Sequence, residues 1–406
     1  MMVSMPKFST LFSLKFKVLT FSLLSGLFLI GCGGDDLYNN GSGGSTTGGN
    51  VPSYTISFLD DNLDVFESVT KESGNVNITY IAENELGINV DVYAANGVLV
   101  KGNSDFEEFN LTKNVVFYTA NVNELDGSTG LIVDNASGKY ILTGDIELNN
   151  PWVPIGNITD PFDGVFNGNG HKVTNLSISG GNGVGFFGYV KDAQIKNLGI
   201  EINGELKGND HVGGIAGYAK DSNITNSYSK GDISGSNYVG GIAGYAENNN
   251  VNNSYSRGDI GGTSDSVGGI AGYAKDSNIT NSYSTGNING NNNVGGIVGW
   301  TDNADIIHNV AINLYINASI ASNKKANRIV GYSNLGNITD NFALNSTEVD
   351  GIVVPDNDYN GANKTEAELQ KQSTYEILGW EFGEDDAKPW KINEGKGLPY
   401  FYWEDL

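Results

Sequence analysis

Tyrosines recur at a fixed spacing in the middle of the sequence, each among nearly the same neighbouring residues. A tyrosine ring offers an apolar face and a polar hydroxyl, so a regular row of such rings is suited to binding sugars or another extended chain. The alternative is that the rings pack on one another and stabilise the fold. The two candidate sets are Tyr228, Tyr255 and Tyr283, and Tyr218, Tyr245, Tyr273 and Trp300, with Tyr332 as a further member of the second.

The chain has one cysteine, Cys32, and its position suggests lipid chemistry. It follows a basic segment and an apolar stretch, residues 18–30, which is typical of a signal peptide and too short to span a bilayer comfortably. The residues from Leu29 to Cys32 resemble a bacterial lipobox, whose cysteine thiol carries a diacylglycerol after cleavage. We therefore expect lipidation at Cys32 and a location in the bacterial cell envelope, at the outer membrane or cell surface. An ordinary signal peptide with an unpaired cysteine nearby is the alternative.

The sequence contains no recognisable catalytic pattern. Its three histidines lie in different contexts, and the zinc-protease pattern HExxH does not occur. Enzymes that cleave acidic polysaccharides need clustered carboxylates and a nearby Arg or Lys base, whereas this chain has two arginines, Arg257 and Arg328. We therefore expect neither enzymatic activity nor a cofactor, and a polysaccharide-active enzyme is a distant alternative.

One segment partly matches a calcium-binding loop. Asp356, Asp358 and Asn360 occupy the spacing of its first ligands, and Gly361 follows them. The twelfth position should be a glutamate that binds with both oxygens, but here it is Ala367. The sequence favours a polar turn, with a calcium site as the alternative.

The elements that must position the tyrosines are sequence repeats. Copies of VGGIAGY or a close variant begin at Val212, Val239, Val267 and Val294, at intervals of 27, 28 and 27 residues. A fixed period in this range is typical of a solenoid, in which each unit buries its apolar face against its neighbour. The repeats are too rich in Gly and Asn for a helix and contain short runs of β-branched residues. They predict a β-helix with about three short strands and three corners per rung.

The apolar residues of the repeats predict the interior of the coil. Val212 and Ile215 can both point inward only if the chain bends at the two glycines between them. The equivalent residues Ile215, Ile242 and Ile270 should then form one buried column. An asparagine recurs before the next strand and should form a ladder of side-chain amides at a corner. The four asparagines are Asn226, Asn253, Asn281 and Asn309.

The same register predicts where the first tyrosine set points. Because side chains alternate along a strand, Ser227 and Ser229 should point inward and Tyr228 outward. Tyr228, Tyr255 and Tyr283 are therefore expected to form an exposed ladder, and the second set should lie beside another corner.

Several motifs together resemble the GLUG-repeat proteins, which occur among bacterial surface adhesins. They are the VGGIAGY copies, YILTGDIELNN from Tyr140, PWVPIG from Pro151, FDGVFNGNGHKVTNLSI from Phe162, GFFGYVKDAQIKNLGI from Gly185 and GLPYFYW from Gly397. The resemblance covers roughly residues 138–406. It implies a right-handed parallel β-helix and a role in surface display, but it implies no chemistry.

Outside the repeats, the sequence predicts an all-β chain with further regions at both ends. Alternating segments such as Val90–Tyr93 suggest a small β-sandwich, immunoglobulin-like in one interpretation and an N-terminal extension of the solenoid in the other. Residues 364–378 should form a helix, with Thr365 and Glu368 as a capping box, inside a cap that covers the open end of the coil. The expected regions are a lipoprotein signal peptide (1–31), a Gly/Ser-rich tether (32–52), a small β domain (53–130), the β-helix (131–350) and the C-terminal cap (351–406).

The charge of the chain limits its partners. It has 23 Lys and Arg against 47 Asp and Glu, a net charge of −24, which disfavours nucleic acid and electrostatic binding to anionic lipid. The lipid at Cys32 would instead provide the attachment to the membrane. The sequence therefore favours a surface protein whose β-helix binds a glycan, or a protein of a host or neighbouring cell. A structural spacer without its own ligand is the alternative.

Overall fold

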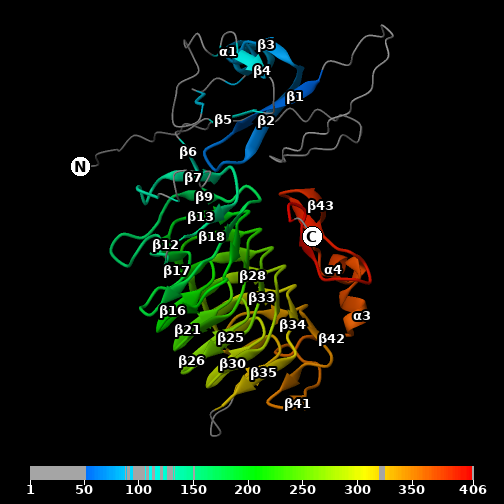
Figure 1. Cartoon of the computed structure of the whole chain (residues 1–406). Helices are drawn as coiled ribbons and strands as arrows, with labels where there is room; N and C mark the ends of the chain where they lie inside the picture. The colour runs from blue at the N-terminus through cyan, green and yellow to red at the C-terminus, as the bar shows by residue number, and fades with distance from the viewer. Residues whose placement is uncertain are drawn as a thin grey trace, which may run out of the picture. The chain divides into compact units, whose positions relative to one another are not determined.

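The computed structural model describes residues 52–86, short segments between residues 88 and 131, and residues 133–149, 151–319 and 325–404. In this part of the chain, strands dominate and the helices are short (Figure 1). None of the described helices combines the length and apolar character needed to cross a membrane. Cys32, the predicted signal peptide and most of the tether lie outside the described residues.

The repeats form a parallel β-helix whose rungs contribute strands to five sheets. The predicted number of three strands per rung is wrong, because a complete rung contains five. Segments such as Asn237–Gly240 also form strands. They are hard to predict because glycine is uncommon in strands. The rung that begins at residue 210 consists of β16 (Asp210–Gly213), β17 (Ala216–Lys220), β18 (Asn223–Thr225), β19 (Tyr228–Lys230) and β20 (Ile233–Gly235).

Two of the sheets contain nine strands each and lie on neighbouring sides of the coil. The first comprises β6 (Asn123–Leu125), β7 (Lys139–Leu142), β9 (Val165–Asn167), β13 (Gln194–Lys196), β18, β23 (Asn250–Asn252), β28 (Asn278–Thr280), β33 (Asp305–Ile307) and β38 (Ile338–Thr339). The second comprises β8 (Ile146–Glu147), β10 (Lys172–Thr174), β14 (Gly199–Glu201), β19, β24 (Tyr255–Arg257), β29 (Tyr283–Thr285), β34 (Val310–Ile312), β39 (Phe342–Leu344) and β42 (Ala362–Lys364).

The other three sheets complete the coil. One comprises β11 (Ile178–Ser179), β15 (Leu206–Lys207), β20, β25 (Ile260–Gly262), β30 (Ile288–Gly290), β35 (Tyr315–Ala318), β40 (Glu348–Val349) and β41 (Ile352–Val353), the last antiparallel. The next comprises β16, β21 (Asn237–Gly240), β26 (Asp265–Gly268), β31 (Asn292–Gly295) and β36 (Ala326–Asn327). The last comprises β12 (Phe187–Lys191), β17, β22 (Ala243–Glu247), β27 (Ala271–Lys275), β32 (Val298–Asp302) and β37 (Val330–Ser333).

The predicted interior of the coil is confirmed. Ile215, Ile242 and Ile270 are completely buried and belong to one continuous core. The bend that brings them inward falls between β16 and β17, as expected from the two glycines. A Cβ atom on Gly213 would lie 2.3 Å from the carbonyl oxygen of Ala216, so this bend accepts only glycine.

The asparagine ladder is also present, with one correction. Asn226, Asn253 and Asn281 have φ angles of 48°, 47° and 50°, a left-handed conformation that asparagine tolerates better than most residues. The Asn253 amide donates to the Asn226 side chain at 3.2 Å. In the next rung this position is occupied by His308, with φ 63°, because Thr280 pairs with Ile307. The expected member Asn309 lies one residue further along, where it is buried and its Oδ1 accepts from the Ser282 amide.

The N-terminal region combines a small sheet with a helical turn over one apolar core. Residues 78–85 form a helical turn that begins after Asn77, whose side chain accepts a hydrogen bond from the Tyr80 amide. In the alternating segment at Val90–Tyr93, residues 90 and 91 lie outside the described part, and Tyr93 forms one bridge with Tyr118. The elements are β1 (Ser53–Leu59), β2 (Val65–Glu72), β3 (Gly74–Val76), α1 (Ile78–Tyr80), η1 (Ile81–Glu85), β4 (Phe109–Leu111) and β5 (Val115–Tyr118).

Residues 366–404, here called the C-terminal strap, follow the last rung. The capping box of Thr365 and Glu368 is confirmed, but the expected single helix is divided, because Gln370 leaves the helical conformation and Lys371 is extended. The strap packs along the side of the coil rather than over its open end, since its rings contact strands from several rungs (Figure 1). Its elements are α3 (Glu366–Leu369), α4 (Gln372–Glu376), β43 (Phe382–Asp385), β44 (Lys388–Lys391) and β45 (Tyr400–Phe401).

Candidate binding face

The first tyrosine set is not exposed, contrary to the prediction. Tyr228, Tyr255 and Tyr283, here called the covered ladder, are 2%, 0% and 0% exposed. Their rings do lie outside the coil, because the alternation was predicted correctly: Ser227 and Ser229 are buried, and the Ser229 hydroxyl donates to the Gly241 carbonyl at 2.6 Å. The strap then covers the rings.

Aromatic side chains of the strap pack against the covered ladder. Trp403 lies 5.6 Å from the Tyr228 ring, Phe401 lies 5.5 Å from Tyr255, and Trp390 lies 6.0 Å from Tyr283, all measured between ring centroids. The Trp390 side chain is completely buried. This ladder therefore stabilises the fold by packing, which was the alternative interpretation of the tyrosines.

The strap also binds hydroxyl groups of the covered ladder. The Tyr255 hydroxyl donates to Glu404 at 2.5 Å, and the Lys230 ammonium donates to the same carboxylate at 2.6 Å. The Tyr283 hydroxyl donates to the Pro399 carbonyl at 2.7 Å. These two hydroxyls are satisfied within the chain, and all three rings are buried, so the covered ladder is not accessible to an external ligand.

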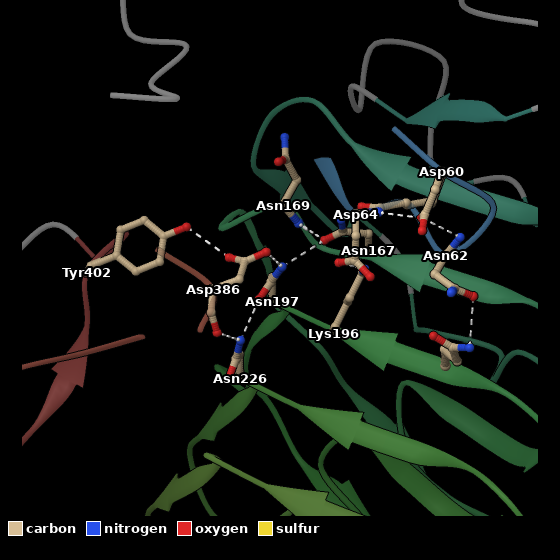
Figure 2. Close-up of polar contacts among 12 residues, drawn as sticks. Asp60, Asn62, Asp64, Asn167, Asn169, Lys196, Asn197, Asn226, Asp386 and Tyr402 are labelled. Carbon is tan, nitrogen blue, oxygen red and sulfur yellow. Dashed lines mark hydrogen bonds and ion pairs between the residues drawn. The ribbon is translucent and has the colours of Figure 1, made fainter. Parts of the chain in front are cut away.

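Figure 2 shows a polar network that fixes the strap to the asparagine corner. One oxygen of Asp386 accepts from the Asn197 amide and the other from the Tyr402 hydroxyl, both at 2.9 Å. Burial, and then the Asp386 carboxylate, raise the pKa of Tyr402, so this phenol remains a donor. In the same view Lys196 forms an ion pair with Asp64 of the N-terminal region. These charges are paired within the chain, and the network is structural.

The second tyrosine set lies on the outer face of the β17 sheet and remains partly accessible. Its rings, here called the open ladder, are Tyr189, Tyr218, Tyr245, Tyr273, Trp300 and Tyr332, which pair in register from rung to rung. Tyr273 is 8% exposed, and the five other rings are half-buried. Tyr189 was not predicted, although GFFGYVKDAQI repeats the spacing of IAGYAKDSNI.

The rings of the open ladder contact one another from rung to rung, some stacked and others tilted or edge to face, which changes what they can offer. The centroids of Tyr218 and Tyr245 lie 4.8 Å apart with an angle of 13° between the rings. Tyr245 and Tyr273 lie 4.7 Å apart at 57°, and Tyr273 and Trp300 lie 5.0 Å apart at 67°. The ring faces are largely occupied by neighbouring rings, so the ladder presents mainly its ring edges and hydroxyl groups.

Four of the five hydroxyls of the open ladder, those of Tyr189, Tyr245, Tyr273 and Tyr332, have no hydrogen-bond partner among the described residues, and Tyr245 and Tyr273 are the two central ones. No described side chain or carbonyl accepts a hydrogen bond from Tyr245 or Tyr273, and neither oxygen is a buried atom without a partner. Burial raises the pKa of Tyr245 and raises that of Tyr273 to about 12, so both phenols remain protonated donors at neutral pH. They can donate hydrogen bonds to a ligand.

A row of charged side chains borders the open ladder two residues further along each strand. Lys220, Glu247 and Lys275 are in register, and the Glu247 carboxylate accepts from both lysines, at 3.2 Å and 3.3 Å. It also accepts from the Tyr218 hydroxyl at 2.5 Å. The hydrogen bond from Tyr218, and secondarily those from the lysines, lower the pKa of Glu247 against the opposing effect of burial. With Asp302, which is in register with Lys275, this border contains two cations and two carboxylates.

Two further rings widen the open ladder and were missed in the sequence. His211 stacks on Tyr238 at 5.4 Å and points its edge at Tyr218, also at 5.4 Å. Burial lowers the pKa of His211, while the carboxylate of Asp210 opposes the shift. The two rings occupy the position just before the repeat valine. The signal was weak because Ser266 and Asn293 stand there in the next copies.

The candidate calcium residues do not converge on a common centre. Asp356 pairs with the buried guanidinium of Arg328 at 3.4 Å. The Asn360 side chain accepts from the Arg328 amide at 3.0 Å and donates to Asn357. Across the described residues, no three His, Cys, Asp or Glu side chains are grouped so that they could hold a metal ion. The segment forms a turn around Arg328.

The repeats and the parallel stacking define a β-helix, and two of its rungs match the GLUG motif. The model of the GLUG motif matches residues 208–234 and 263–289, which lie within the rungs that carry the open ladder.

Two known proteins are similar to this chain over part of its length. One is halomucin of Haloquadratum walsbyi, 33% identical over 176 residues, which are 39% of this chain and 2% of halomucin. The other is the crystal structure of a candidate immunoglobulin A1 protease from Bacteroides ovatus. It has a TM-score of 0.50 and 23% identity, covers 66% of this chain and 86% of that one, and shows the fold alone. The GLUG repeats and the similarity to halomucin favour a repetitive cell-surface protein.

Proposed function

We propose that this chain is a non-enzymatic surface protein that binds an extended polymer along the open ladder. The observation that carries the proposal is the row of ring edges at one-rung spacing, in which Tyr245 and Tyr273 keep hydroxyls without a partner among the described residues. Hydrogen bonds to such a row can be made repeatedly by a polymer that lies along the coil axis. Adhesion to a glycan or to a neighbouring cell would follow from this binding.

Lipid attachment at Cys32 is the second part of the proposal. A lone cysteine after an apolar leader, followed by a Gly/Ser-rich tether, supports an anchor that holds the β-helix away from the membrane. Cys32→Ser should move the protein from the membrane fraction to the soluble fraction of the cell. Retention of the variant in washed membranes would contradict the anchor while leaving the binding proposal intact.

The spacer remains a second candidate because the ladder rings stack on one another. Stacked rings stabilise a solenoid whether or not they bind anything, and the covered ladder shows this use in the same molecule. A spacer would need no free hydroxyls. Removing them should therefore weaken ligand binding only if the ladder is a binding face.

A binding screen with a hydroxyl-deletion variant distinguishes these functions. The purified protein is tested against a glycan array and a panel of matrix proteins, beside the double variant Tyr245→Phe/Tyr273→Phe. Phenylalanine keeps the stacking and removes the hydroxyls, so the variant should melt like the parent but bind at least about tenfold more weakly. Tyr315→Phe, an exposed tyrosine outside the ladder, is the matched control and should bind normally.

The screen also tests the other interpretations. If the protein binds no polymer, or if the double variant binds as well as the parent, the spacer is favoured. Incubation of each bound glycan with the protein, followed by an assay for new reducing ends, tests the absence of enzymatic activity. New ends would instead support a polysaccharide-active enzyme.

A further inference from the structure

We infer that the ligand of the open ladder is an uncharged, hydroxyl-rich glycan chain that lies parallel to the coil axis. The inference rests on the proposed function and names the class of polymer. It is carried by three features of the face: which parts of the rings are free, which charges border them, and what the backbone beneath can still bind.

The free parts of the rings favour hydroxyl groups over aromatic side chains. Because the Tyr218 and Tyr245 rings lie face to face at 4.8 Å, a ligand ring cannot enter between them. It meets ring edges, which carry the positive part of the aromatic charge distribution, and the phenol donors of Tyr245 and Tyr273. Both features attract oxygen acceptors. Their spacing of one rung is also close to the advance of one sugar unit in an extended chain.

The bordering charges disfavour a polyanion. Glu247 lies between Lys220 and Lys275, accepts from both, and offsets one of their two positive charges. Beyond Lys275 the next charge in register is the Asp302 carboxylate, which offsets the second lysine. At the other end Lys191 is in register with Lys220 and forms an ion pair with Asp192. With a net charge of −24 on the chain, an anionic polysaccharide would be repelled from this face. An uncharged glycan meets no such penalty.

The backbone beneath the ladder disfavours an extended peptide. Each of the strands β17, β22, β27 and β32 pairs with a neighbour on both sides. Peptides that bind β-sheets commonly add a strand to a free edge, and these strands have no free edge. The covered ladder supports the distinction, because there the aromatic strap already occupies the rings and their hydroxyls.

The test uses polysaccharides that differ in charge alone. A soluble mixed-linkage β-glucan, a galactomannan and hydroxyethyl cellulose are each compared with their carboxymethylated derivatives by isothermal titration at low salt. A synthetic peptide with the sequence of residues 380–404 represents an aromatic polypeptide. The full-length protein should bind at least one neutral glycan, at least about tenfold more tightly than its carboxymethylated derivative. The peptide should not bind.

Glu247→Gln provides a charge-specific readout. Glutamine can still accept from Tyr218, but the two lysines lose their compensating charge, so affinity for the carboxymethylated derivative should rise by about fivefold. Lys71 forms an exposed ion pair with Glu85 far along the chain, so Glu85→Gln is the control and should change neither affinity.

The outcomes separate the inference from the function on which it rests. If the carboxymethylated derivatives or the peptide bind more tightly than every neutral glycan, and the Tyr245→Phe/Tyr273→Phe variant loses that binding, the face binds a polymer and the ligand class is wrong. If no polymer binds, or if binding survives the double variant, the proposed function itself is wrong.

Discussion

The covered and open ladders are two uses of the same repeat. Both are columns of rings on the outside of the coil, and their spacings agree, at 5.0 Å between Tyr228 and Tyr255 and 4.8 Å between Tyr218 and Tyr245. They differ in what lies over them. The strap buries the first column and accepts two of its hydroxyl hydrogens, whereas the second remains half-buried with free hydroxyls at Tyr245 and Tyr273.

This difference shows that a periodic ring in a solenoid has no fixed role. The rung geometry places the ring outside the coil and sets the distance between successive rings. A segment distant in sequence then determines whether the ring becomes part of a core or part of a surface. Substitutions in the covered ladder should therefore mainly reduce stability, whereas substitutions in the open ladder should mainly reduce binding.

The largest expected contrast is between two tryptophans. Trp390→Ala should reduce the free energy of unfolding by about 3–5 kcal/mol, because this buried ring stacks at 4.6 Å on both Trp380 and Phe401. Trp300→Ala in the open ladder should cost about 1–2 kcal/mol, since its ring is half-buried. Urea unfolding followed by circular dichroism measures both. Equal losses would mean that the open ladder is as important for the fold as the strap that covers the other ladder.

A smaller contrast concerns single hydroxyls. Tyr255→Phe removes the donor to Glu404, a carboxylate whose side chain is 4% exposed, and should cost about 1–3 kcal/mol. Tyr245→Phe removes a hydroxyl without a partner among the described residues and should change stability by less than about 0.5 kcal/mol. The same unfolding experiment applies. A large loss in Tyr245→Phe would show that its hydroxyl has a structural role after all.

The smallest effect should be a pH dependence at the open ladder. Burial lowers the pKa of His211 from its usual value near 6.5, so the folded state binds fewer protons than the unfolded state. The corresponding stability is present above about pH 6.5 and is lost as pH falls through the lowered pKa. His211→Tyr, which places here the residue found at position 238, should remove this dependence.

Melting temperatures at pH 7.5, 6.0 and 5.0 measure that difference. The covered ladder contains no histidine, so the parent and Tyr255→Phe should show the same slope. A slope that persists in His211→Tyr would assign the pH dependence to another group. Glu247, whose pKa is also lowered, acts only at a lower pH, below its usual value near 4.3.

The sequence predicted those features that depend on neighbouring residues within one repeat. The Ile215 column, the inward serines and the asparagine corner all follow from alternation and period, because equivalent residues occupy the same backbone position in each rung. The capping box at Thr365 is likewise local. The β-helix is therefore predictable from the repeats, whereas the GLUG motif is identified by resemblance.

The features that were not predicted depend on distant contacts or on diverged copies. Burial of Tyr255 is caused by Phe401 and Trp390, which lie far along the chain and outside the repeats. Asn309 was assigned to the corner because the last copy contains an asparagine near the expected place, while strand pairing places His308 there. The stacking that hides the ring faces depends on side-chain angles, which the period does not determine.

The strap has a mechanical consequence. It contacts the coil at Asn197, Asn253 and His308, in rungs that are well separated along the axis. Hydrogen bonds between rungs run along that axis. Without the strap, a force that pulls along the axis would break them one rung at a time. A segment fastened at several rungs must slide past all of them at once, which places its contacts in shear. We therefore expect the strapped rungs to resist stretching together, as one mechanical unit.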